Sequence, residues 1–195
     1  MRAPRRYIPG ISAHVFQRGH NRLPIFHKTA DYKYFLTLVR QASAECGADV
    51  HAYAVMNNHY HLIATPQHER ALPQAMQTID GEYTRYYNRE HCRSGTAWNA
   101  RYRSKLIEDE AYWLTCLRYV EQNPVNAQIV RSAELYEWTS YRVHAMGGFN
   151  DWLTPHPVYL QLGDTPADRQ RAYRLLCEVS DTVVDLPRCL TPRLP

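Results

Sequence analysis

The chain has 195 residues, of which 45% are hydrophobic and only 8 are glycine, so it can bury a core and does not have a disordered composition. It contains no apolar run of about 18 residues, and its basic start lacks the apolar stretch of a secretory signal, so we expect a cytoplasmic protein with no membrane span. The net charge of +4 identifies no partner, and the 5 scattered cysteines lack the short spacing of a zinc knuckle or a redox dithiol.

The first predicted elements are a strand and a helix. The segment 11–17 is typical of a strand, and it ends at Arg18-Gly19. From Thr29 or Asp31 to Cys46, apolar residues recur with helical spacing, at Phe35, Leu38, Val39 and Ala42. This periodicity predicts a helix with one buried face, and Gly47 ends it.

A hairpin and a second helix follow. The segments 49–56 and 59–65 are typical of strands, and Asn57-Asn58 between them favours a tight turn, because Asn tolerates positive backbone angles. A second helix is predicted over 69–90, with a buried face formed by Leu72, Ala75, Met76, Ile79, Tyr83 and Tyr86 or Tyr87.

The next predicted strand, 101–107, has basic residues at alternate positions, and a third helix begins near Asp109. The apolar stripe of this helix consists of Trp113, Leu117 and Val120. The order strand, helix, strand, strand, helix, strand, helix predicts an α+β fold of the ferredoxin-like (RRM-like) kind. Such a fold has one antiparallel sheet with two helices on one face and leaves the other face free for a site. One more helix is predicted over 166–179.

Two pairs of residues indicate chemistry. His59 and His61 are two apart on a strand, so both side chains leave the same face and can converge on one ion. On the third helix, Tyr119 and Asn123 lie one turn apart and point away from the apolar stripe. Imidazole with a carboxamide oxygen suits Mg²⁺ or Mn²⁺, and the same ligands also accept Zn²⁺. Two unrelated sheet histidines, a half-buried tyrosine and an Asn that caps a helix before Pro124 would give the same pattern.

Basic residues gather in two parts of the chain. The first group lies near the N-terminus and the second between residues 85 and 105, where tyrosines are interleaved with it. The groups are Arg2, Arg5, Arg6, Arg18 and Arg22, and Arg85, Arg89, Arg93, Arg101, Arg103 and Lys105. This mixture suits phosphates and stacked bases, although a solvated basic surface over packed tyrosines would look the same.

The order of these motifs resembles a known family. His59-Tyr60-His61 on a central strand, followed by Tyr119-Val-Glu-Gln-Asn123 on a later helix, resembles the single-tyrosine HUH transposases of the insertion-sequence type. The sequence looks closest to the REP-associated tyrosine transposases. Further matching phrases are Gln17-Arg-Gly-His-Asn21, Ile25-Phe26, Thr96-Ala-Trp98, Arg101-Tyr-Arg-Ser104 and Trp138-Thr-Ser-Tyr141. The resemblance indicates a transposase domain over 1–145 and a C-terminal extension over 146–195 with no assigned role.

Two positions depart from the family pattern. The turn before the first histidine usually carries Pro and Asn, but here it is Asn57-Asn58. The middle residue of the histidine triplet is usually aliphatic, but here it is Tyr60, which we expect to point to the opposite face and pack among helices. Neither departure removes a reacting group.

The resemblance implies a metal-dependent single-stranded DNA endonuclease and strand transferase. Tyr119 would form a 5′-phosphotyrosine intermediate, and His59, His61 and Asn123 would hold the divalent ion. The substrate would be single-stranded DNA with a hairpin, of the REP-like palindromic kind. The protein would act as a monomer, as expected of the REP-associated transposases, or as a homodimer, like the transposases of mobile insertion sequences. The residues expected to bind DNA are Arg5, Arg6, Arg18, Asn21, Arg22, Arg101, Arg103 and Lys105.

Two other classes of function fit part of the pattern. A non-catalytic nucleic-acid-binding module could use a ferredoxin-like sheet with basic and aromatic residues, and it would bind without cutting. A metal-dependent hydrolase could use His59 and His61 with Glu121 or His14 as a further ligand or base. Of the three, only the transposase attaches DNA covalently to itself.

Overall fold

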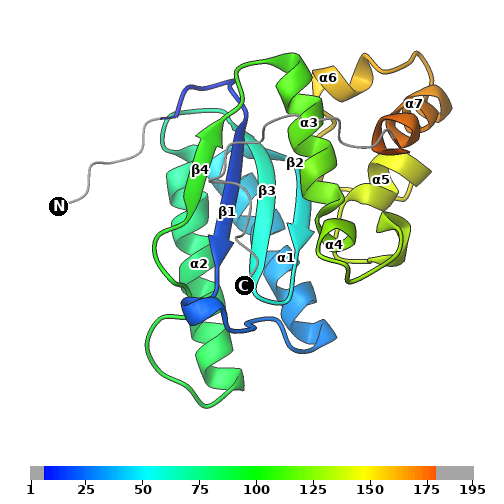
Figure 1. Cartoon of the computed structure of the whole chain (residues 1–195). Coiled ribbons are helices and arrows are strands. Elements are labelled where there is room, and N and C mark those ends of the chain that lie inside the picture. The colour runs from blue at the N-terminus through cyan, green and yellow to red at the C-terminus, as the bar shows by residue number, and fades with distance from the viewer. Residues whose placement is uncertain (1–6, 179–195) are drawn as a thin grey trace.

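A four-stranded antiparallel sheet organises residues 7–178, the part of the chain that this computed structural model describes (Figure 1). The strands are β1 (Ala13–Arg18), β2 (Ala48–Val55), β3 (His59–Pro66) and β4 (Arg103–Leu106), in the order β2-β3-β1-β4. The connections are α1 (Thr29–Cys46), between β1 and β2, and α2 (Ala71–Glu90), between β3 and β4. This is the predicted ferredoxin-like arrangement. No helix within residues 7–178 is both long and apolar enough to cross a membrane.

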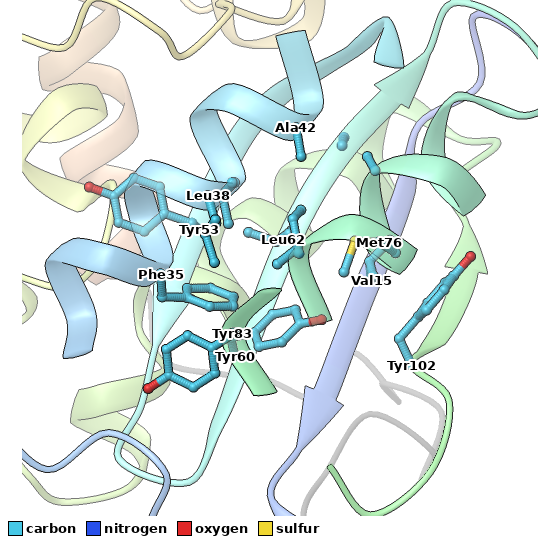
Figure 2. Close-up of a cluster of buried hydrophobic side chains, with 14 of the residues drawn as sticks. Val15, Phe35, Leu38, Ala42, Tyr53, Tyr60, Leu62, Met76, Tyr83 and Tyr102 are labelled. Atoms are coloured by element: carbon cyan, nitrogen blue, oxygen red, sulfur yellow. The ribbon is translucent and has the colours of Figure 1, made fainter. Parts of the chain in front are cut away.

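The two long helices, α1 and α2, cover one face of the sheet, which we call the helix face. The core between them is formed by side chains such as Val15, Phe35, Leu62 and Met76, all of them buried (Figure 2). Every position of the apolar stripes predicted for α1 and α2 is buried. Tyr60 points into this core, as expected, and packs against the ring of Phe35.

The hairpin between β2 and β3 forms where predicted, but the reason given for its turn was wrong. Neither Asn57 nor Asn58 has a positive φ; the non-glycine residues with positive φ near the site are Asn21 and Arg22. The turn is held instead by hydrogen bonds, because the carbonyl of Asn57 accepts from the backbone amides of Ile25 and Phe26. The hairpin tip is therefore tied to the segment that follows β1.

The third long helix, α3 (Glu110–Glu121), packs on the opposite face, which we call the site face. Trp113 and Leu117 of α3 lie in a buried cluster with Ala52, Ala54 and Ile63 of the sheet. The helix begins at Asp109, whose carboxylate accepts a hydrogen bond from the backbone amide of Tyr112 at 2.7 Å. After Gln122 the chain continues into the short helix α4 (Asn123–Asn126).

Three further helices gather beside α3 (Figure 1). They are α5 (Tyr141–Met146), α6 (Pro157–Leu160) and α7 (Pro166–Glu178), and two short 3-10 turns, η1 (His20–Arg22) and η2 (Ala133–Leu135), complete the fold. The sequence predicted α7 but not α5 or α6, because helices of one turn or so are too short to show a periodic pattern.

A buried carboxylate joins α3 to this C-terminal region. Glu121 is fully buried and accepts hydrogen bonds from Nδ1 of His144 at 2.7 Å, from the hydroxyl of Tyr173 at 2.7 Å and from the hydroxyl of Ser140. Burial of a carboxylate is costly unless such partners surround it. The partners lie just before α5, on α5 and on α7, so the last turn of α3 is fixed to the helices that follow it.

Candidate active site

The two histidines of the triplet lie on the site face of β3, as predicted. His59 pairs with Arg18 and His61 with Phe16 of β1, and residues directly opposite in an antiparallel pair share a face. The two imidazole rings are 5.1 Å apart between centroids and nearly perpendicular. The sheet therefore presents both rings to the space beneath α3.

Asn58 orients the ring of His59. Nδ2 of Asn58 donates to the carbonyl oxygen of Arg22 at 2.9 Å, so its Oδ1 is the atom that lies 2.7 Å from Nδ1 of His59. Since Oδ1 only accepts, Nδ1 of His59 carries the proton and Nε2 keeps a lone pair. Burial, and then the charge of Arg18, lower the pKa of His59 to about 4, so the ring is neutral at neutral pH.

His61 is more deeply buried than His59. Its Nδ1 lies 2.8 Å from Nε2 of His14, whereas its Nε2 is buried and has no hydrogen-bond partner within the described chain. Burial lowers the pKa of His61 well below its usual value, with a smaller contribution from His14. An unpaired buried ring nitrogen is unfavourable, so this atom is suited to a ligand.

Tyr119 lies over the histidines. Its ring meets His61 edge-on at 5.6 Å and His14 at 5.9 Å between centroids. The expectation that Tyr119 points well away from the apolar stripe was incomplete, since its side chain is only 9% exposed and belongs to the cluster under α3. The reason is that the sheet beneath this part of the helix is itself polar, so a residue beside the apolar stripe can also face the sheet.

Asn123 does not serve as the cap of a helix. The residue before α4 is Gln122, and the side chain of Asn123 is buried with its Oδ1 3.4 Å from Nε2 of His59. Both atoms are acceptors, because the proton of His59 is on Nδ1. Two acceptors that face each other without a hydrogen between them are the arrangement expected of two ligands of one cation.

The residues present fit a divalent ion. The candidate donors are Nε2 of His59, Nε2 of His61 and Oδ1 of Asn123, two neutral imidazoles and an amide oxygen. No cluster of three or more His, Cys, Asp or Glu side chains in residues 7–178 is arranged to hold a metal. The amide of Asn123 is therefore needed to complete a three-ligand set.

Cationic side chains border this space. Arg18 stands opposite His59, and burial lowers its pKa, with further lowering by the charges of Arg22 and Arg103. Arg103 and Lys105 of β4 are paired with Phe16 and His14, so they share the site face. Nζ of Lys105 donates to the hydroxyl of Tyr112 at 3.0 Å. The structure thus brings Arg18, Arg103 and Lys105 to one side of the sheet, and the charge of Arg22 acts on Arg18.

The remaining predicted DNA contacts are distributed differently. Asn21 is exposed in η1, with a φ of 53°. Arg101 precedes β4 and lines a cavity of about 770 Å³ together with Asp80 of α2 and with Trp98. Arg5 and Arg6 lie outside the described residues.

Comparison with known proteins gives the family. The sequence pattern of the family described as "Transposase IS200 like" matches residues 8–123, which is more than half of the chain. No curated protein matches the chain.

One solved structure shares the fold. A REP-associated tyrosine transposase bound to a REP hairpin superposes with a TM-score of 0.63 at 18% identity, over 80% of this chain and 93% of that one. A transposase candidate from Deinococcus radiodurans has a TM-score of 0.42 at 18% identity, over 66% of this chain and 98% of that one, which is too low to carry an argument. The fold is thus shared with a tyrosine transposase, and the match over residues 8–123 places the chain in the IS200-like transposase family.

Proposed function

We propose that this transposase cleaves and rejoins single-stranded DNA, with Tyr119 as the nucleophile and with His59, His61 and Asn123 as ligands of a divalent ion. One observation carries the proposal. The ring of Tyr119 packs edge-on against His61, and Asn123, one turn further along the chain, faces His59. A phenol and three acceptor atoms from distant parts of the sequence therefore surround one space.

The divalent ion is expected from the family, whose members generally use one. Mg²⁺ or Mn²⁺ suits two imidazoles and an amide oxygen that leave positions for phosphate oxygens and water. When bound, such an ion supplies charge neutralisation at the scissile phosphate. The protein's part is to keep both imidazoles neutral and their Nε2 atoms unprotonated, which Asn58 and the burial of His59 favour.

The reacting group is the hydroxyl of Tyr119. Its oxygen attacks the phosphorus and loses its proton, and the 3′ oxygen of the upstream nucleotide leaves and takes up a proton. The downstream fragment stays on Tyr119 through its 5′ phosphate. Because the phosphotyrosine bond keeps the energy of the broken ester, an incoming 3′ hydroxyl can displace Tyr119 without ATP.

The DNA would lie along the site face. Arg18, Arg103 and Lys105 are suited to contact the backbone, since they share that face with the histidines. A hairpin with a single-stranded flank is the proposed substrate, and its support is the fold shared with a transposase that binds a REP hairpin. Residues 1–145 would form the catalytic part, and the chain would act as a monomer or a homodimer.

Incubation with labelled DNA tests the chemistry. The protein is mixed with a single-stranded oligonucleotide library of hairpins and Mn²⁺, and the products are run on a denaturing protein gel. A 3′ label should migrate with the protein, and a 5′ label should appear on a free fragment that a polymerase extends. Excess of that fragment should reverse the reaction.

The same experiment separates the other two classes of function. A non-catalytic binding module would bind the DNA but leave it intact. A hydrolase would cut it and leave neither label on the protein. A 5′ label on the protein would mean a 3′-phosphotyrosine, and the proposed polarity would be wrong.

A further inference from the structure

A third histidine lies beside His61 on the site face of the sheet. His14 of β1 is fully buried, and its Nε2 lies 2.8 Å from Nδ1 of His61. The two rings are 5.0 Å apart between centroids and tilted by only 23°. The other nitrogen of His14, Nδ1, is buried and has no hydrogen-bond partner within residues 7–178. This contact links residues 47 positions apart in the sequence.

The contact between His14 and His61 contains a single proton. A hydrogen bond of 2.8 Å between two ring nitrogens needs one donor and one acceptor, so one of the two facing atoms carries the proton. Either Nδ1 of His61 donates to His14, or Nε2 of His14 donates to His61. In the first case the lone pair of His61 is on Nε2. In the second case Nε2 of His61 is protonated and cannot bind a cation.

We propose that His14 is a positioning residue that accepts a hydrogen bond from Nδ1 of His61 and so keeps the Nε2 lone pair of His61 available to the divalent ion. This inference rests on the metal site of the proposed function. Asn58 has the same effect on His59 from the other end of the triplet, so both ligands adopt one tautomer.

This role differs from that of a ligand or a base. Nε2 of His14 is occupied by His61, and Nδ1 is fully buried, so neither nitrogen reaches water or DNA. His14 would therefore act on the ion only through His61. Loss of a hydrogen-bond partner of a metal-ligating histidine typically costs about 10–100-fold in metal affinity.

Metal affinity without DNA provides the first test, since it does not depend on catalysis. Calorimetric titration with Mn²⁺ should give a dissociation constant about 10–100-fold higher for His14→Phe, which keeps a ring but no acceptor. His14→Gln, whose Oε1 can replace Nε2 as acceptor, should recover most of the loss. His156→Phe is the matched control, because His156 stacks on Trp113 away from the site, and it should bind Mn²⁺ like the wild type. Equal affinity of His14→Phe and wild type would overturn the inference.

The tautomers provide the second test, on the unchanged protein. In Mg²⁺-saturated protein, nitrogen-15 NMR of the imidazoles should show His61 and His14 both protonated at Nδ1. A proton on Nε2 of His14 would overturn the inference even if His14→Phe failed to fold. Both measurements are independent of DNA cleavage. Wild-type protein that binds Mn²⁺ in this tautomer but forms no covalent DNA complex would refute the proposed function and leave the inference standing.

Discussion

Buried polar atoms on and beside strands β1 and β3 differ in their pairing between the two faces of the sheet. On the helix face, the hydroxyl of Tyr60 donates to Asp80 at 2.8 Å and that of Tyr83 to the carbonyl of Ile25 at 2.6 Å. On the site face, Nδ1 of His14 and Nε2 of His61 are buried without partners in the described chain. Satisfied polar atoms stabilise a fold, whereas unsatisfied ones cost stability, and of these two atoms Nε2 of His61 is the one that we assign to the ion.

The same strand supplies both faces. In β3, Tyr60 and Leu62 point into the helix-face core, while His59 and His61 point to the site. Because strand side chains alternate, a slip of one residue in register would exchange the two sets. The hydrogen bonds at the hairpin tip, between Asn57 and the segment after β1, oppose that slip.

The largest expected difference between the faces is the effect on covalent DNA attachment of removing one tyrosine hydroxyl from each face. Tyr119→Phe should lose covalent DNA attachment completely and keep its fold and DNA binding, because only the nucleophile is removed. Tyr83→Phe should keep attachment and lose about 1 kcal/mol of stability, because it breaks one buried hydrogen bond. Denaturing gels and urea unfolding measure the two effects. Attachment by Tyr119→Phe would move the nucleophile elsewhere, with Tyr112 the next candidate.

Removing larger side chains should separate stability from metal binding. Phe35→Ala should lower the free energy of unfolding by about 3–5 kcal/mol, because it opens a cavity in the helix-face core. His59→Ala should change the free energy of unfolding of the metal-free protein by less than about 1 kcal/mol, because His59 is half-buried, and should abolish the thermal stabilisation by Mn²⁺. Thermal melts with and without Mn²⁺ and a chelator test both. Mn²⁺ stabilisation that survives in His59→Ala would refute the ligand assignment.

Acid should lower the free energy of unfolding, because histidines on the site face are buried in the neutral form. Burial lowers the pKa of His14 to about 3, so below about pH 6.5 the unfolded chain binds a proton that the folded chain does not. Stability should then fall as the pH falls from 6.5 towards 4, by about 1.4 kcal/mol per pH unit for His14. His59 and His156 should add smaller amounts, because their pKa values are lowered less, to about 4.

Asp80, on the helix face, should partly offset this loss of stability at low pH. Burial raises the pKa of Asp80 to about 7, so the folded chain takes up a proton there first, and stability rises as the pH falls below 7. Urea unfolding at pH 7 and pH 5 should show the net loss, and it should be larger in Asp80→Asn. Equal stability of Asp80→Asn at both pH values would contradict the low pKa values of the buried histidines.

The smallest effect is expected at Asn58. Asn58→Ala should weaken Mn²⁺ binding by only a few fold, less than His14→Phe, because His59 is half-buried and water can replace the lost amide oxygen. Calorimetric titration of both variants gives the comparison. A larger loss at Asn58 than at His14 would reverse the assigned importance of the two partners.

Much of the fold was predictable because its signals are local. The stripe from Phe35 to Ala42 and the alternation of His59 with His61 follow from helix and strand geometry alone. The turn at Asn57 was placed well but explained wrongly, because its hydrogen bonds come from Ile25 and Phe26, about thirty residues earlier in the chain. Contacts between residues so far apart in the chain cannot be predicted from the local sequence pattern.

The candidate site was predictable only as a list of residues. The sequence named Tyr119, His59, His61 and Asn123, but not that Nε2 of His59 faces the amide of Asn123, a residue 64 positions away. His14 was considered only as a ligand or base. Its alternation with Phe16 and Arg18 on one strand was the available signal, and the partner of its Nε2 required the register between β1 and β3.

The carboxylate of Glu121 has a consequence for how the protein is made. The residue lies two positions after Tyr119, and one of its partners, Tyr173, leaves the ribosome 52 residues later. Until Tyr173 has been synthesised, the buried carboxylate of Glu121 at the end of α3 lacks one of its hydrogen-bond donors. We therefore expect α3 to reach its final position late in synthesis, after the sheet and its two long helices have formed. Such an order would keep the phenol and its neighbouring ligands from coming together on an incomplete chain.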